Sequence, residues 1–196
     1  MKEAVTIAVT GSRRTGKTTT LTLFGYIAKQ NNYEVWADFN LKFADRHFSS
    51  LTEIQEITKP TVILSDEAHR IADSRLSMLN IADTYALILQ GHYPDTIVFM
   101  ALPFHLSDIA LVDIRIRYLF DYEIRPLIQN NTLFLRYYML KSGKYLNDKP
   151  VIKAIPNISR IWNYFDTHEK FIFQTKGKKP VLTSKHIPLE KYSSDE

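Results

Sequence analysis

The sequence predicts an α/β domain with a mostly parallel central sheet flanked by helices. An apolar, β-branched run at 4–9 leads into Gly11–Thr18, which matches the phosphate-binding pattern G-x-x-x-x-G-K-S/T without a mismatch. A helix-forming stretch follows at 19–30, which completes a strand–loop–helix unit. The short apolar runs at 61–64 and 96–101 are typical of buried parallel strands. We therefore expect a P-loop NTPase fold.

The other elements are assigned from hydrophobic periodicity and turn residues. Pro60 precedes the strand at 61–64, and Asn31-Asn32 precedes another strand. We assign no element to 40–59, and we expect Lys141–Lys144 to turn the chain back as an added C-terminal β-hairpin. The expected strands are 33–39, 118–124 and 132–140, and the expected helices are about 71–89, 107–117 and 157–166.

Composition limits the domain organisation. The chain of 196 residues is long enough for one α/β domain with a sizeable core and too short for two of ordinary size. We expect a P-loop ATPase domain at 1–170 and a basic, extended tail at 171–196. The net charge of +4 favours a polyanionic partner, although the lysines of the tail are equally compatible with a solvated segment.

The same composition argues against several classes of protein. No apolar run approaches 18 residues, so we expect no transmembrane helix and no membrane partner. The first residues lead directly into a strand, which leaves no room for a signal peptide. The absence of cysteine rules out disulfides and cysteine-based zinc sites, and it suits an intracellular protein.

The segment Gly11–Thr18 is the candidate nucleotide site. Gly11 and Gly16 allow successive N–H groups to point into one anion-sized nest, and the following helix adds the positive end of its dipole. Lys17 is expected to reach the β- and γ-phosphates, and the Thr18 hydroxyl to ligate magnesium (Mg2+). The predicted nucleotide-binding residues are Gly11, Ser12, Arg13, Arg14, Thr15, Gly16, Lys17, Thr18 and Thr19.

An acidic pair, Asp66-Glu67, stands where the strand at 61–64 ends. Asp66 is expected to hold the magnesium shell, usually through water, and Glu67 to polarise the attacking water as a general base. An exposed turn is the alternative interpretation of such a pair. A hydrolase needs a base for water, whereas a small-molecule kinase needs mainly a substrate pocket. The chain also lacks the Asn-Lys-x-Asp motif that reads guanine, which favours ATP over GTP.

Further motifs follow in a fixed order. They are Asp66-Glu67-Ala68-His69, Asp73-Ser74-Arg75, Leu89-Gln90-Gly91-His92, the strand at 96–101 and Asp113-Ile114-Arg115-Ile116-Arg117. This series resembles the FtsK–HerA superfamily, and within it the genome-packaging ATPases of archaeal turreted icosahedral and related double-jelly-roll viruses. The ordered motifs cover roughly residues 4–125, and Asp166–Glu169 is similar to the C-terminal end of such proteins.

The resemblance implies a RecA-like motor that hydrolyses ATP and drives double-stranded DNA into a preformed capsid. Such motors are homo-oligomeric rings, hexamers or pentamers, in which an arginine from the neighbouring subunit completes each site. It implies that Lys17, Glu67 and Arg75 are the catalytic residues, with Arg115 and Arg117 as further candidates for the trans-acting arginine. The implied partners are capsid or portal-vertex proteins, and the implied location is the host cytoplasm or the virion.

Two positions depart from the family pattern. His92 stands where family members often have an arginine, and Ala101-Leu102-Pro103 stands where many have a sensor glutamine. Gln90, His105 and Ser107 are the candidate substitutes for that glutamine.

Two other functions remain open on the sequence alone. A P-loop nucleoside or nucleotide kinase shares this length and fold, and Arg13-Arg14 would offer extra phosphate contacts, but no arginine-rich lid is evident. A non-enzymatic nucleotide sensor is the third possibility, and Glu67 argues against it because a sensor needs no base.

Overall fold

A computed structural model of the chain describes residues 4–66, 95–107, 118–147, 149–165, 171–176 and 179–184. The chain divides into two compact units, Met1–Phe165 and Asp166–Glu196. The first unit contains the strands β1 (Val5–Thr10), β2 (Glu34–Ala37), β3 (Arg46–His47), β4 (Thr61–Ser65), β5 (Thr96–Leu102), β6 (Tyr122–Gln129), β7 (Thr132–Lys141), β8 (Lys144–Tyr145) and β9 (Val151–Pro156). Its described helices are α1 (Lys17–Gln30) and the 3₁₀ helices η1 (Leu51–Glu56) and η4 (Ile158–Tyr164).

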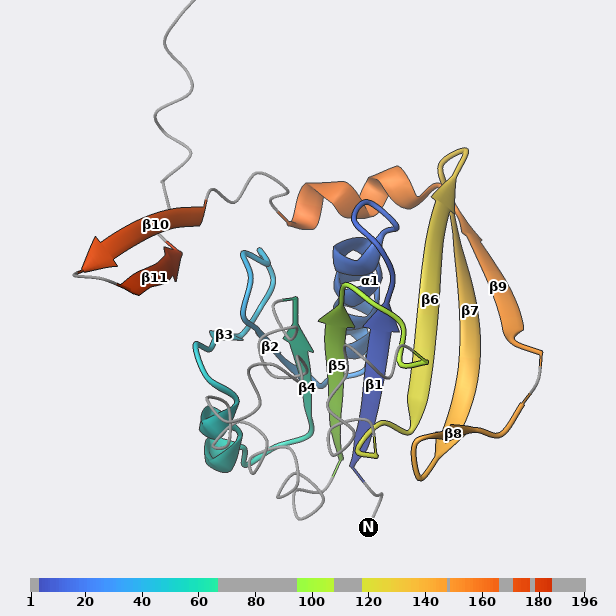
Figure 1. Cartoon of the computed structure of the whole chain (residues 1–196), viewed down its shortest axis with the longest axis horizontal. Helices are drawn as coiled ribbons and strands as arrows, with labels where there is room; N and C mark the ends of the chain where they lie inside the picture. Colours follow the sequence, from blue (N-terminus) through green and yellow to red (C-terminus); the bar gives the residue numbers. More distant parts are fainter. Residues whose placement is uncertain are drawn as a thin grey trace, which may run out of the picture. The chain divides into compact units, whose positions relative to one another are not determined.

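The strands of this unit form one sheet in the order β3-β2-β4-β5-β1-β6-β7 (Figure 1). Each pair from β3 through to β6 is parallel, and β7 returns antiparallel to β6. The outer edge of β7 pairs with β9 along one part and with β8 along another. The mostly parallel sheet with an added β-hairpin is confirmed. The carboxyl ends of β1, β2, β4 and β5 therefore meet at one edge.

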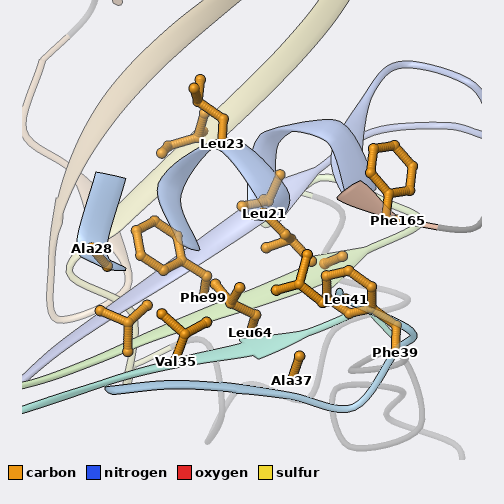
Figure 2. Packing of buried hydrophobic residues seen from close by; sticks show 14 of the residues in the cluster. Leu21, Leu23, Ala28, Val35, Ala37, Phe39, Leu41, Leu64, Phe99 and Phe165 are labelled. Atoms are coloured by element: carbon orange, nitrogen blue, oxygen red, sulfur yellow. The ribbon is translucent and has the colours of Figure 1, made fainter. Parts of the chain in front are cut away.

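The helix α1 covers one face of this sheet. Its buried residues include Leu21 and Ala28, and they belong to a cluster with Val35 of β2, Leu64 of β4 and Phe99 of β5. Figure 2 shows Leu21 in this cluster with Leu64 and Phe99. Because α1 follows β1 directly, this packing fixes the first helical turn beside the end of the strand.

A second buried cluster lies on the opposite face. Successive residues of a strand point to opposite faces, so Ala8 of β1 joins this cluster while Val9 joins the cluster under α1. Its other buried members are Trp36, Phe48, Ile57, Ile63, Val98, Met100, Leu102, Leu106, Phe120 and Leu140. The central strands are thus buried on both sides, which explains their continuous apolar runs.

The strand expected at 118–124 begins later, at Tyr122, and runs on to Gln129. The preceding residues are held differently: Phe120 is buried in the core, and the Asp121 carboxylate accepts a 2.9 Å hydrogen bond from the N–H of Thr6. Asp121 N–H in turn donates to Thr6 O at 2.9 Å. This bonding at the start of β1 delays the strand, so the expected boundary was wrong.

Two tight turns set the register of the added strands. Asn130 and Asn131, both with φ near 50°, join β6 to β7, and Ser142 and Gly143 join β7 to β8. Positive φ at both central residues matches the twist of a two-residue hairpin. The turn at 141–144 was expected, whereas the first turn and β9 were not.

The expected short helix at 157–166 is present as η4, and the interval 40–59 contains β3 and η1. In the second unit, β10 (Phe171–Lys176) pairs antiparallel with β11 (Lys179–Ser184) within the range expected to be an extended tail. The helices expected at 71–89 and 107–117 lie outside the described residues. The division into a domain at 1–170 and a tail at 171–196 stays a prediction.

Candidate functional site

The segment 11–18, here called the 11–18 loop, joins the end of β1 to the start of α1. Its backbone enters the left-handed region at Arg14 (φ 64°) and at Gly16 (φ 99°). Alternation of this kind turns neighbouring N–H groups toward a common point and creates an anion-binding concavity. A non-glycine residue such as Arg14 in this conformation is under strain, which is characteristic of ligand-binding loops.

Gly16 is required by two features of this loop. It caps the N-terminus of α1 with a positive φ that side chains rarely adopt. A Cβ at this position would also lie 2.7 Å from Cδ1 of Ile128 on β6. Glycine therefore allows β6 to pack directly against the beginning of the helix.

Lys17, the first residue of α1, folds back over the loop. Its Nζ donates hydrogen bonds of 2.9 Å to the carbonyl oxygens of both Gly11 and Ser12. Burial lowers the pKa of Lys17; the charge of Asp66 opposes this effect and that of Arg13 adds to it. The ammonium group thus lies at the mouth of the concavity, half-buried among backbone amides.

Thr18 connects the loop to the end of β4. Its hydroxyl donates a 2.8 Å hydrogen bond to Oδ2 of Asp66, which follows β4. The two residues are 48 positions apart in the sequence, and the parallel order β4-β5-β1 brings them to one edge of the sheet. A hydroxyl and a carboxylate in contact are hard oxygen donors of the kind that magnesium prefers.

Solved structures with a similar fold include the genome-packaging NTPase B204 of Sulfolobus turreted icosahedral virus 2 in complex with ATP-gammaS. It is 11% identical with a TM-score of 0.52, and the match covers 80% of this chain and 99% of that chain. B204 from Sulfolobus turreted icosahedral virus is 13% identical with a TM-score of 0.50, covering 80% and 99% of the two chains. An ATPase domain, 10% identical with a TM-score of 0.52, matches over 84% and 85% of the two chains. No family model and no curated protein matches the sequence.

The chain has a RecA-like P-loop NTPase fold. In this fold ligands bind outside the carboxyl ends of the parallel strands. The 11–18 loop, Lys17 and the Thr18–Asp66 pair all lie at that edge.

The structure of this P-loop NTPase domain also reveals a residue that we did not single out from the sequence. Asp38 directly follows β2, and its Oδ2 accepts a 2.6 Å hydrogen bond from the Ser65 hydroxyl. Its Oδ1 accepts a 2.8 Å bond from the backbone N–H of Asp66. Asp38 therefore fixes the peptide that carries Asp66. The available signal was its position at the end of a predicted strand, where parallel strands share an edge.

A second unanticipated group lies beneath the loop on the face opposite α1. Thr10, the last residue of β1, donates its hydroxyl to Oε1 of Glu123 at 2.5 Å. Nδ1 of His105, one of the candidate sensor residues, lies 3.0 Å from the same hydroxyl oxygen. Glu123 was not predictable as a partner, because its strand was expected only as an apolar segment.

The predicted site residues divide into two groups. The nine residues Gly11–Thr19 and Asp66 are described and lie together at the strand ends. Glu67, Arg75, Arg115 and Arg117 lie outside the described residues, as do Gln90 and His92, so their predicted roles stay predictions. Among the described helices, none is long and apolar enough to span a membrane.

Proposed function

We propose that this protein binds ATP with magnesium at the 11–18 loop and hydrolyses it. The observation that carries the proposal is the Thr18–Asp66 contact, because it places a hydroxyl and a carboxylate beside a loop shaped for phosphate. Lys17 adds a positive charge within reach of the same space, since its Nζ already lies on the loop carbonyls. The similarity to solved ATPase structures supports the same conclusion.

The proposed roles follow from these positions. Backbone N–H groups of the loop and the N-terminus of α1 bind the phosphates, and Lys17 stabilises charge on the β- and γ-phosphates. The oxygens of Thr18 and Asp66 fit magnesium, which keeps several waters and needs few protein ligands. When bound, the metal neutralises charge on the phosphate oxygens. Glu67, the residue after Asp66, is the proposed base for the attacking water.

We further propose that hydrolysis drives double-stranded DNA, most specifically a viral genome entering a preformed capsid. Supporting this are the ordered motifs of the FtsK–HerA type, the similar structure of a viral packaging NTPase and the net charge of +4. The proposed assembly is a homo-oligomeric ring, a hexamer or pentamer, in which Arg75 of one subunit reaches the site of the next. Capsid or portal-vertex proteins would be its partners, and the host cytoplasm or virion its location.

The test is the steady-state rate of ATP hydrolysis with and without linear double-stranded DNA at low salt, where phosphate contacts are strongest. Glu67→Gln and Lys17→Ala are the blanks. Lys59→Ala is the matched control, because Lys59 is a solvent-exposed lysine that precedes β4, at the far edge of the sheet. A DNA-stimulated rate that both blanks lose and the control keeps supports the motor.

Two results would contradict it. ATP hydrolysis by a strict monomer, with no DNA binding at low salt, would remove the translocation proposal. Phosphoryl transfer to a nucleoside monophosphate would identify a kinase instead.

A further inference from the structure

Glu123, on β6, is a fully buried carboxylate with four hydrogen-bond donors. Oε1 accepts from the Thr10 hydroxyl at 2.5 Å and from the backbone N–H of Leu106 at 3.1 Å. Oε2 accepts from the Tyr145 hydroxyl at 2.5 Å and from Nη2 of Arg125 at 2.9 Å. One side chain therefore joins the end of β1, the segment after β5 and the short strand β8.

The carboxylate is charged in spite of its burial. Burial by itself raises the pKa of Glu123, but the hydrogen bonds from Arg125, Thr10 and Tyr145 outweigh it, and the net pKa is lowered. Burial and the bond to this carboxylate raise the pKa of Tyr145 to about 12, so its hydroxyl stays a donor. A buried charge with this set of donors is held in one geometry, because any donor that leaves exposes an unpaired charge.

The donors place this carboxylate directly at the base of the 11–18 loop. Thr10 precedes Gly11, whose N–H donates to Leu102 O at 3.2 Å and whose carbonyl accepts from Lys17. Glu123 thus reaches the first residue of the loop through one intervening side chain, Thr10.

The polar chain also extends toward solvent through His105. Thr10 has a single hydroxyl hydrogen, and it is donated to Glu123. Nδ1 of His105 must therefore be the donor to Oγ1 of Thr10 across 3.0 Å, which defines the tautomer of the imidazole. The residue after it, Leu106, contributes its backbone N–H to the same carboxylate. Both residues that follow β5 are consequently organised by Glu123.

The opposite end of the loop meets the same pair of strands. A Cβ at Gly16 would lie 2.7 Å from Ile128 of β6 and 3.4 Å from Leu133 of β7, so these side chains pack on the start of α1. The β6–β7 pair therefore contacts the loop at its beginning, through Glu123 and Thr10, and at its end, through Ile128 and Leu133.

We infer that Glu123 is a positioning residue for the nucleotide site: acting through Thr10, it holds the base of the 11–18 loop in the shape that binds phosphate. Through Tyr145 it ties that shape to β8 and so to the added hairpin. The inference rests on the proposed function, because the loop must bind a nucleotide for its shape to matter. Glu123 itself touches no bound phosphate.

The test compares two substitutions at Thr10, measured as the Kd for ATP-gammaS with magnesium by calorimetry. Thr10→Val keeps the shape of the side chain and removes the hydroxyl, and Thr10→Ser keeps the hydroxyl. Thr10→Val is expected to raise the Kd by about tenfold, as the loss of a hydrogen bond to a charged group predicts, and Thr10→Ser to recover most of the affinity. Thr61→Val is the matched control, since Thr61 is also a fully buried threonine, but it starts β4 and donates to Lys59 O.

A second variant tests the connection to β8. Tyr145→Phe removes one donor from Oε2 and is expected to raise the Kd by about threefold, as a partial weakening of the network predicts. An unchanged Kd in Tyr145→Phe would remove the proposed tie to the hairpin.

The outcomes separate the inference from the proposed function. If Thr10→Val melts at a lower temperature but binds ATP-gammaS like the wild type, Glu123 is only a structural group and the inference is wrong. An equal loss of affinity in Thr61→Val would also overturn it, because the effect would then be general. If the wild type binds no ATP-gammaS, the proposed function fails first, and the inference fails with it.

Discussion

Oδ1 of Asp38 accepts a 2.8 Å hydrogen bond from the backbone N–H of Asp66, so the end of β2 orients the residue that follows β4. Asp38 also receives the hydroxyl of Ser65 at 2.6 Å and donates its own N–H to Leu64 O at 3.1 Å. The carboxylate that meets Thr18 is thus held by three bonds that do not involve the 11–18 loop. The metal-binding edge is built before any ligand arrives.

Substitution of Asp38 should reduce activity through Asp66. Asp38→Ala is expected to lower the rate of ATP hydrolysis by about 10- to 100-fold, the usual effect of losing a partner that orients a metal ligand. The control is Asp45→Ala, because Asp45 also accepts a backbone N–H, that of Val35 at 2.9 Å, but at the start of β2. Equal losses in both variants would argue against a specific role for Asp38.

The Thr18–Asp66 pair should determine the dependence on magnesium. Thr18→Val and Asp66→Asn are each expected to raise the magnesium concentration needed for half-maximal hydrolysis by about 10- to 100-fold, because each removes an oxygen ligand. Thr18→Ser should behave nearly as the wild type, since it keeps the hydroxyl. A magnesium titration of the hydrolysis rate after treatment with a chelator measures this. A Thr18→Val protein with the magnesium dependence of the wild type would contradict the assignment.

Gly16 should tolerate no side chain. In Gly16→Ala the new Cβ meets Ile128 at 2.7 Å in a backbone with φ of 99°, so we expect about 1–3 kcal/mol of lost stability and loss of nucleotide binding. Gly25→Ala is the control: its Cβ would meet Leu64 at 2.6 Å, but its φ is not in the left-handed region. That variant should lose stability and keep its affinity for ATP-gammaS once folded. Chemical denaturation and calorimetry distinguish the two.

Glu123 should make the stability of the fold depend on acid. Its pKa is lowered from an ordinary value of 4.5, so its contribution is complete above pH 4.5 and is lost as the pH falls through the lower pKa of the folded state. Glu123→Gln should be less stable than the wild type at pH 7 by roughly 3 kcal/mol, and the difference should shrink below pH 4. Urea denaturation at pH 7, 5 and 3.5 measures it. A difference that is the same at all three pH values would contradict a charged Glu123.

Much of the parallel sheet could be predicted because each strand is a local signal. The apolar runs at 61–64 and 96–101 became β4 and β5 within one residue at each end. Strands buried on both faces need continuous apolar residues, and this pattern is visible without any knowledge of neighbours. The strand at 118–124 failed because Asp121 bonds to Thr6, a contact between distant residues that no local pattern encodes.

The sequence by itself determined the 11–18 loop, because its glycines, lysine and threonine are adjacent and their chemistry is local. It also placed Asp66 at the end of a strand. Only the tertiary structure decided that Asp38 orients Asp66 and that Glu123 supports Thr10. These partners come from strands that lie far apart in the sequence, and the strand order that makes them neighbours is set by the packing of the whole sheet. A buried carboxylate is moreover stable only when all its donors converge, which is a property of the folded chain.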